Sequence, residues 1–290
     1  MTLVRRVLSG RWSLLLAAVA ATSCGDDPAQ TPATPATTDA APMPTPTVTV
    51  PGPPLEYSVS SDARGWSLAW HDEFDGDRVD PKRWYVSSGY KGHGTISSAF
   101  SPDCVEVKDG VLRIFAKRTV GAEYPYATGR IDSFKRYGQR YGRVEVRARF
   151  PRAPGVWYAI WARPESGPLP ELDIEVKETS GALRAWFVNH WDLPPVPADQ
   201  RRSFFTVEDV DPTEFHVYGV TWLPGLVEWT IDGVPYMRST TKGVPDSPIF
   251  WTLNGWTGGW GGNPAADLPL PVAFEVDYFR YYAAPFAGTQ

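Results

Sequence analysis

The segment Leu169-Pro-Glu-Leu-Asp-Ile-Glu-Val-Lys177 decides the fold that this sequence predicts. Three aliphatic residues in it alternate with three carboxylic acids: Leu172, Ile174 and Val176 with Glu171, Asp173 and Glu175. Because successive side chains of a β-strand point to opposite faces, the aliphatic residues share a core face and the carboxylates share the other. The segment therefore predicts a half-buried strand that presents a row of acids.

Strand and turn signals of this kind run through the body of the chain. Residues 144–150 alternate apolar and charged side chains, and residues 274–282 predict a strand with bulky residues on both faces. Asp109-Gly110 and Asp232-Gly233 each separate two strand-like segments, and Asp-Gly favours the tight turn of a β-hairpin. No amphipathic helix exceeds about three turns. Together these signals predict one all-β domain, a sandwich or jelly roll.

Composition excludes several functional classes. The 290 residues carry a formal net charge of −5, and 42% of them are apolar, enough for a sizeable core. The mild acidity argues against a nucleic-acid groove, which needs a basic face. Two cysteines exclude a disulfide scaffold and a cysteine-based zinc site, and the four histidines lack zinc-binding spacing. The 13 tryptophans match tyrosine and phenylalanine in number, which suits a site that stacks on sugar rings.

The N-terminal segment predicts export. Arg5 and Arg6 precede an apolar run at residues 12–21 that is too short to span a membrane, as in a secretory signal. Cys24 resembles the lipidated cysteine of bacterial lipoproteins, and nine prolines keep residues 25–54 extended. We therefore expect a signal peptide at residues 1–24, a linker at 25–54 and a folded domain at 55–290. The expected location is the cell surface, through a lipid on Cys24, with a secreted soluble form as the alternative.

The acidic row suits one kind of chemistry. Retaining glycoside hydrolysis needs two carboxyl groups about 5–5.5 Å apart, one as nucleophile and one as acid/base. The backbones of Glu171 and Glu175 are ~13 Å apart along a strand, a gap that long side chains on a curved sheet can close. The charge of Asp173 between them raises the pKa of a neighbouring carboxyl group, as a general acid requires. An exposed edge strand made acidic for solubility is the structural alternative.

At these residues the chain resembles a known family. Glu171-Leu-Asp173-Ile-Glu175 resembles the Glu-x-Asp-x-Glu signature of glycoside hydrolase family 16 in its unbulged, lichenase-like form. The family often has Trp or Gly just before the first Glu, where this chain has Leu169-Pro170, so the resemblance leaves the exact glucan open. Further blocks follow in the family's order: His71-Asp-Glu-Phe-Asp-Gly76 with Asp80-Pro-Lys-Arg-Trp84, Gly129-Arg-Ile-Asp-Ser133 with Tyr141-Gly-Arg-Val-Glu-Val-Arg147, Phe215-His-Val-Tyr218, Trp222, Asp232-Gly233, and Val276-Asp-Tyr-Phe-Arg280.

The resemblance implies a concanavalin-like β-jelly-roll sandwich of two curved antiparallel sheets, with a β-glucan on the concave sheet. It makes residues 55–290 a catalytic domain in which Glu171 is the nucleophile, Asp173 its helper and Glu175 the acid/base. It implies no cofactor for catalysis, but a possible structural calcium ion held by Asp277 with backbone groups near Glu73 and Gly110. The residues expected to bind substrate, two of them tryptophans presented by a glycine-rich rim loop, are Arg130, Trp157 or Trp161, His190, Asn254, Trp256 and Trp260.

The expected function is a monomeric, retaining, endo-acting glycoside hydrolase of β-1,3-glucan or mixed-linkage β-1,3-1,4-glucan. The weak net charge gives no reason to expect a sulfated or uronic-acid polymer, which would call for a basic groove. A cell-wall transglycosylase that uses the same covalent intermediate is an alternative. A non-catalytic surface lectin is another, and the presence of all three acids argues against it.

Overall fold

The computed structural model describes residues 65–89, 94–192, 202–240 and 242–284. The predicted signal peptide, Cys24 and the predicted linker lie outside the described residues. The regular structure in this part of the chain consists of two β-sheets, with η1 (Pro102–Cys104) and η2 (Gly259–Gly261) as single 3-10 turns. The all-β prediction is therefore confirmed.

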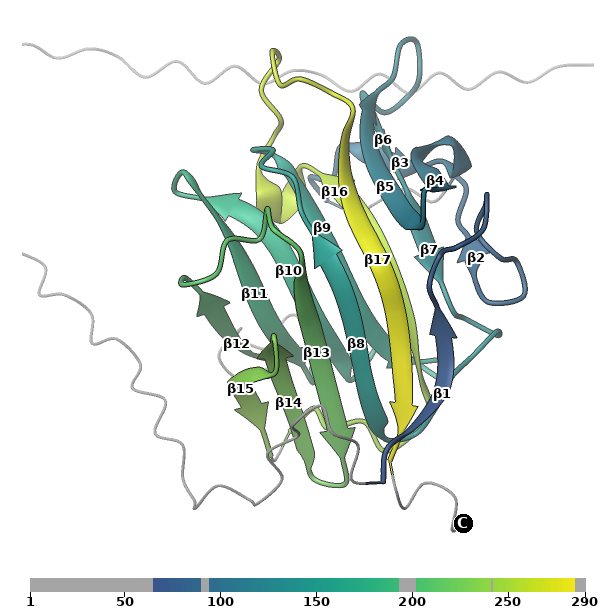
Figure 1. Ribbon diagram of the computed structural model, residues 1–290. Coiled ribbons are helices and arrows are strands. Elements are labelled where there is room, and N and C mark those ends of the chain that lie inside the picture. The colour runs from purple at the N-terminus through teal and green to yellow at the C-terminus, as the bar shows by residue number, and fades with distance from the viewer. Residues whose placement is uncertain (1–64, 90–93, 193–201, 241, 285–290) are drawn as a thin grey trace, which may run out of the picture. The chain divides into compact units, whose positions relative to one another are not determined.

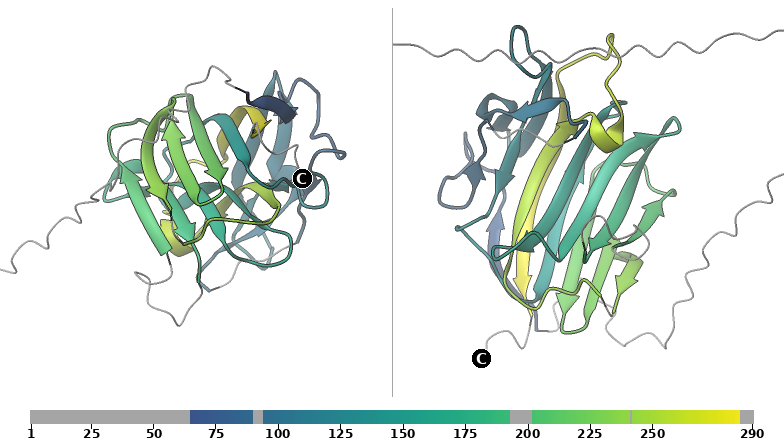
Figure 2. Two further views of the ribbon diagram at one scale, coloured as in Figure 1. Left: turned by 90° about the horizontal axis from the view of Figure 1, so that it is seen from below. Right: turned by 180° about the vertical axis from the view of Figure 1, so that it is seen from behind.

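The two sheets lie face to face as curved layers (Figures 1 and 2). The ten-stranded sheet contains β1 (Ser67–Asp72), β3 (Ser98–Phe100), β4 (Val105–Lys108), β5 (Val111–Arg118), β6 (Tyr126–Thr128), β8 (Gly142–Arg149), β13 (His216–Leu223), β14 (Leu226–Ile231), β15 (Val234–Ser239) and β17 (Val272–Ala283). The seven-stranded sheet contains β2 (Tyr85–Val86), β7 (Arg130–Asp132), β9 (Val156–Pro164), β10 (Glu171–Thr179), β11 (Ala182–His190), β12 (Arg202–Val207) and β16 (Ile249–Thr257).

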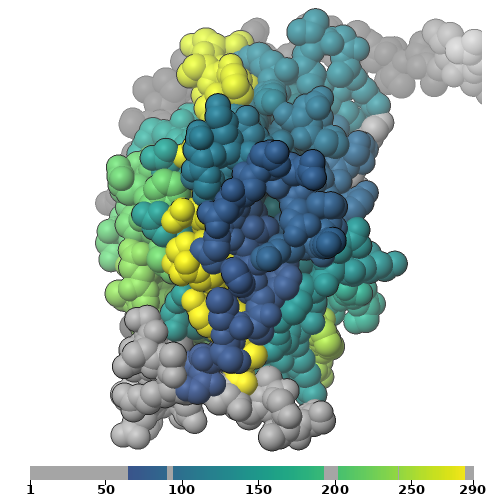
Figure 3. Space-filling model, turned by 45° about the vertical axis from the view of Figure 1, so that its right-hand side comes forward, coloured from purple at the N-terminus to yellow at the C-terminus, as the bar shows by residue number. Residues whose placement is uncertain are grey.

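Strand order places the acidic strand inside its sheet. The seven-stranded sheet runs β12-β11-β10-β9-β16-β7-β2, so β10 has a hydrogen-bonded neighbour on each side. The ten-stranded sheet runs β15-β14-β13-β8-β17-β5-β6-β3, with β1 added to β17 and β4 to β5. Among the described strands, neighbours are antiparallel except for the parallel pair β3 and β6. Figure 3 shows β1, in dark blue, against the yellow strand β17.

The core lies between the two sheets. The aliphatic residues Leu172, Ile174 and Val176 of β10 are at most 1% exposed and belong to it. Trp222 of β13 and Trp229 of β14 reach the same core from the other sheet and are fully buried. The face of β10 that carries its acids therefore points away from the ten-stranded sheet.

The two predicted Asp-Gly hairpins are confirmed. Asp109 and Gly110 link β4 to β5 with φ angles of 55° and 72°. Asp232 and Gly233 link β14 to β15 with φ angles of 51° and 79°. A two-residue turn of this kind requires positive φ at both central residues, which aspartate tolerates and glycine favours.

None of the helices in the described part of the chain has the length and apolar character needed to cross a membrane.

Candidate active site

The three acids of β10 lie side by side on the outer face of the seven-stranded sheet. In the register, Asp173 is opposite Trp161 of β9 and Val188 of β11, and Glu175 is opposite Ala159 and Trp186. Asp173 is only 4% exposed and Glu175 only 8%. Because β10 is an interior strand and its acids are mostly buried, the alternative of an exposed edge strand made acidic for solubility is wrong.

Burial changes the protonation of this row. The pKa of Glu171 is raised to about 7, chiefly by burial and also by the nearby charge of Glu175, while the Arg163 guanidinium acts in the opposite direction. Burial also raises the pKa of Asp173 well above its usual range, with Glu171 and Glu175 as further causes. The row therefore holds protons near neutral pH, as a pair of catalytic carboxyl groups must.

His190 joins the row from β11. Its Nε2 atom is 3.5 Å from Oδ2 of Asp173, and one atom each of Glu171, Asp173 and His190 lie within 4.8 Å of one another. Glu171 and His190 are direct register partners across β10 and β11. The histidine expected to line the cleft is thus beside the carboxylates.

Lys177 was not predicted as a site residue. It lies on the same face of β10, is 4% exposed, and its Nζ atom donates to Oε2 of Glu175 at 3.0 Å. The ammonium group also lies over two indole rings, 4.7 Å from the centroid of Trp186 and 4.4 Å from that of Trp260. The period-two pattern could have placed Lys177 on the acidic face, but its contact with Trp260 depends on the distant turn η2.

Three predicted substrate-binding residues form one contiguous cluster. Trp161 of β9 donates from Nε1 to Oδ1 of Asn254 on β16 at 2.6 Å. Arg130 of β7 is the register partner of Asn254 and lies over the Trp161 ring, 5.4 Å from its centroid. These side chains come from three neighbouring strands on the carboxylate side of the sheet, so the structure brings them together.

The other predicted tryptophans differ in exposure. Trp157 is 9% exposed and donates from Nε1 to the Gly258 carbonyl at 3.0 Å. This bond holds the backbone of the glycine-rich segment at residues 258–262. Trp256 packs against Phe100, with 4.3 Å between ring centroids. Trp260 is 50% exposed and presents an indole to solvent beside Lys177.

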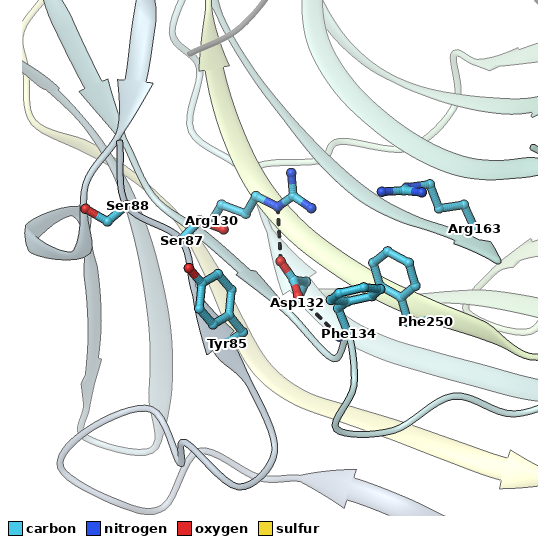
Figure 4. A pocket seen from close by; sticks show the side chains of 8 residues that line it. All are labelled: Tyr85, Ser87, Ser88, Arg130, Asp132, Phe134, Arg163 and Phe250. Carbon is cyan, nitrogen blue, oxygen red and sulfur yellow. Dashed lines mark hydrogen bonds and ion pairs between the residues drawn. The ribbon is translucent and has the colours of Figure 1, made fainter. Parts of the chain in front are cut away.

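A pocket of about 340 Å³ lies beside the carboxylate row of β10 (Figure 4). Its lining comes from β2, β7, β9 and β16 with their adjoining segments, and consists of Tyr85, Ser87, Ser88, Arg130, Asp132, Phe134, Arg163 and Phe250. Sequence reasoning included only Arg130 of these. Arg163 follows Trp161 by two residues and so shares its face, a pattern visible in the sequence.

The residues implied for a calcium ion are held by arginines. Oδ2 of Asp277 accepts a hydrogen bond from Nη1 of Arg147 at 2.6 Å. Arg280 donates to both carboxylate oxygens of Glu73, at 2.9 and 2.7 Å. The implied ligands are the Asp277 carboxylate and backbone groups near Glu73, so the guanidinium that matters is that of Arg147, which would have to move for Asp277 to bind calcium. The site, which the resemblance extends to backbone near Gly110, stays a prediction.

Buried, coupled carboxyl groups on the outer face of a curved sandwich, beside tryptophan rings, define a glycoside hydrolase. Comparison with known families agrees. Residues 94–278 match the family described as Glycosyl hydrolases family 16, and the chain belongs to that family. The predicted jelly-roll sandwich and the prediction of a glycoside hydrolase are both confirmed.

Relatives and solved structures with glucanase names support this assignment. A beta-glucanase of Rhodothermus marinus is 29% identical over 255 residues, which cover 77% of this chain and 87% of that protein. Glucan endo-1,3-beta-glucosidase A1 of Niallia circulans is 27% identical over 75% of this chain, which spans only 38% of that longer protein. The solved endo-beta-1,3-glucanase of Pyrococcus furiosus has a TM-score of 0.66 at 26% identity, covering 75% of this chain and 94% of that one. The chain is therefore a glycoside hydrolase of family 16, and the relatives named here are glucanases.

Proposed function

We propose that this protein is a retaining, endo-acting hydrolase of β-1,3-glucan or mixed-linkage β-1,3-1,4-glucan. The observation that carries the proposal is the placement of Glu171 and Glu175 on one face of β10, close enough for the charge of one to raise the pKa of the other. The glucanase names of the relatives favour β-glucan as the polymer.

In the proposed mechanism Glu171 attacks the anomeric carbon while Glu175 donates a proton to the departing glycosidic oxygen. The Glu171 carboxylate is then bound to the sugar as an ester. Glu175 takes a proton from a water molecule, which attacks the anomeric carbon and releases Glu171. Asp173 and His190 lie against Glu171 and orient it.

These roles require Glu171 to be ionised and Glu175 to be protonated when the reaction begins. In the free protein the pKa of Glu171, raised to about 7, leaves a share of this residue protonated at neutral pH, whereas a nucleophile must be ionised. Interacting carboxyl groups share their protons as a pair, so the reactive arrangement is the one in which Glu175 carries the proton. Arg163 supports that arrangement because it opposes the rise in the pKa of Glu171.

The experiment that tests the function is a reducing-sugar assay on laminarin and lichenan with chain-length analysis of the products. Release of new reducing ends in mid-length fragments supports an endo-acting hydrolase. Products longer than the starting oligosaccharide would show a transglycosylase instead. Binding without any change in chain length would show a lectin.

We also propose that the protein is exported and attached to the cell surface through a lipid on Cys24, and that it acts as a monomer. The charged and apolar N-terminal run, the position of Cys24 and the proline-rich residues 25–54 support the anchor. A tether of this composition holds a folded domain away from the membrane, where a polysaccharide can reach its cleft.

A further inference from the structure

The pocket of about 340 Å³ beside the carboxylate row contains an arginine without an acidic partner. Within the described residues Arg163 makes no ion pair. Its Nη1 donates to the Gly167 carbonyl at 2.9 Å, and its guanidinium lies over the Phe250 ring, 5.1 Å from the centroid. The charges of Glu171 and Asp132 interact with this guanidinium, but neither acid forms an ion pair with it, which makes it a candidate for binding an anion from outside.

The second arginine of the pocket is neutralised within the protein. Nε of Arg130 is 3.3 Å from Oδ2 of Asp132, which is 4% exposed. Figure 4 shows the Arg163 guanidinium pointing across the pocket toward Arg130, with Asp132 below them. Among the residues that line the pocket, one acid thus stands beside two guanidinium groups, and it is paired with Arg130 rather than with Arg163.

The pocket adjoins the reacting carboxylates. Ala162 of β9 pairs with Leu172 of β10, so the next residues along the two antiparallel strands, Arg163 and Glu171, are neighbours. A sugar unit that fills the pocket would thus lie next to the unit attacked by Glu171. Its volume is at the lower end of the range for small-molecule pockets, roughly 300–1,000 Å³.

We propose that this pocket binds an anionic substituent, a carboxylate or a sulfate ester, carried by the glucan chain. The inference rests on the proposed function, because it assumes that a β-glucan occupies the adjacent cleft. A guanidinium offers two parallel N–H donors that match the oxygens of either group. The hydroxyl groups of Ser87 and Tyr85 add further donors, and Phe134 and Phe250 supply an apolar surface for the sugar ring.

This site differs from what the whole-chain charge indicated. A net charge of −5 gave no reason to expect an acidic polymer. The charge that matters is local, however, and the pocket concentrates positive charge that the average conceals. The competing explanation is that Arg163 serves only to favour the ionised form of Glu171, in which case its removal would affect all substrates equally.

The test compares kcat/KM on laminarin, lightly carboxymethylated laminarin and lightly sulfated laminarin of matched chain length. The wild-type protein should prefer at least one anionic polymer by about tenfold, as expected for a charged hydrogen bond. The polymer with the larger preference identifies the substituent. Raising the salt concentration should reduce the preference, because it screens the interaction.

Arg163→Met should lower the ratio of anionic to neutral kcat/KM toward one, and Arg163→Lys should keep part of it. Arg136→Met is the matched control: Arg136 is an exposed arginine outside the pocket whose Nε donates to the Pro81 carbonyl at 2.9 Å. That variant should keep the wild-type ratio. Equal losses on all three polymers in the Arg163 variants would overturn the inference, as would a wild-type protein with no preference.

Failure of the proposed function can be told apart from failure of the site. If the wild-type protein cleaves no β-glucan at all, the proposed function is wrong, and affinity electrophoresis through gels containing the same polymers still tests the pocket. Stronger retardation by an anionic polymer that depends on Arg163 supports the site. Retardation that is the same for Arg163→Lys, Arg163→Met and wild type contradicts it.

Discussion

The indole Nε1 of Trp229 donates a hydrogen bond of 3.1 Å to the main-chain carbonyl of Asp173. Trp229 belongs to β14 in the ten-stranded sheet and Asp173 to β10 in the seven-stranded sheet, so the bond crosses the core of the sandwich. This bond holds β10 from the core side, at the middle residue of the carboxylate row. The position of the acids thus depends on packing on the face opposite to the substrate.

Trp229→Phe should lower the free energy of unfolding and the activity together. Loss of the hydrogen bond leaves a buried carbonyl less well satisfied, at a cost of about 1–3 kcal/mol in addition to the lost volume. Trp222→Phe is the matched control, because Trp222 is equally buried and its Nε1 has no hydrogen-bond partner in the described part of the chain. Thermal unfolding and kcat of both variants measure the difference. Equal losses in the two variants would show that the bond to Asp173 does not position the row.

The roles of Glu171 and Glu175 can be assigned by azide rescue with an activated glucoside. Glu171→Ala removes the nucleophile, so azide should attack the vacated face and give an inverted, α-configured glycosyl azide. Glu175→Ala leaves the covalent step workable for a good leaving group, and azide should then give a β-configured product. Both variants should lose about 10²–10⁴-fold or more on polysaccharide. Products of the opposite configuration would exchange the roles of Glu171 and Glu175.

The raised pKa of Glu171 should appear in the stability of the protein. The folded protein binds this proton more tightly than the unfolded chain, whose pKa is near 4.5. The stabilisation is therefore fully present below pH 4.5 and is lost as pH rises toward 7. The difference in Tm between the wild-type protein and Glu171→Gln (wild type minus variant) should therefore decrease as the pH rises from 4.5 to 7. The control Glu214→Gln changes an exposed carboxylate and should give a flat difference, and a flat difference for Glu171→Gln would contradict the raised pKa.

Asp173→Asn should keep much of the activity. Burial raises the pKa of Asp173 well above its usual range and so favours the neutral carboxyl group, which an amide resembles in shape and charge. The loss should be smaller than the 10²–10⁴-fold expected when an acid or base is removed. Asp173→Ala opens a cavity beside His190 and should cost more. If Asp173→Asn moves the pH profile strongly, Asp173 is ionised in the working enzyme.

The lipid anchor is tested by cell fractionation. With a lipid on Cys24 the mature protein should partition into the detergent phase, and Cys24→Ser should be recovered from the medium. The catalytic domain should keep the same kcat in both forms, since the cysteine lies outside it. Recovery of the unaltered protein as a soluble secreted species would rule out the anchor and leave the signal peptide.

Local patterns predicted the strand that carries the acids and both Asp-Gly hairpins, because period two and positive φ are properties of neighbouring residues. They also placed Glu171, Asp173 and Glu175 on one face. The contacts of Lys177 could not be predicted, because Trp260 approaches it only when η2 folds back over β10. The pocket around Arg163 was missed for the same reason, since its wall requires β2 and β7 to pair beside β16.

Strand β17 follows all other described strands in the chain, yet it lies between β8 and β5 (Figure 1). During synthesis, one edge of β8 and one edge of β5 remain unpaired until β17 has been made. Strand pairing over so long a sequence separation is slow. A chain that has to cross a membrane before folding benefits from this delay, because the chain stays incompletely folded until β17 pairs with β8 and β5. The same delay exposes strand edges to aggregation, so in a cytosol without export the unfinished sandwich is a target for chaperones and proteases.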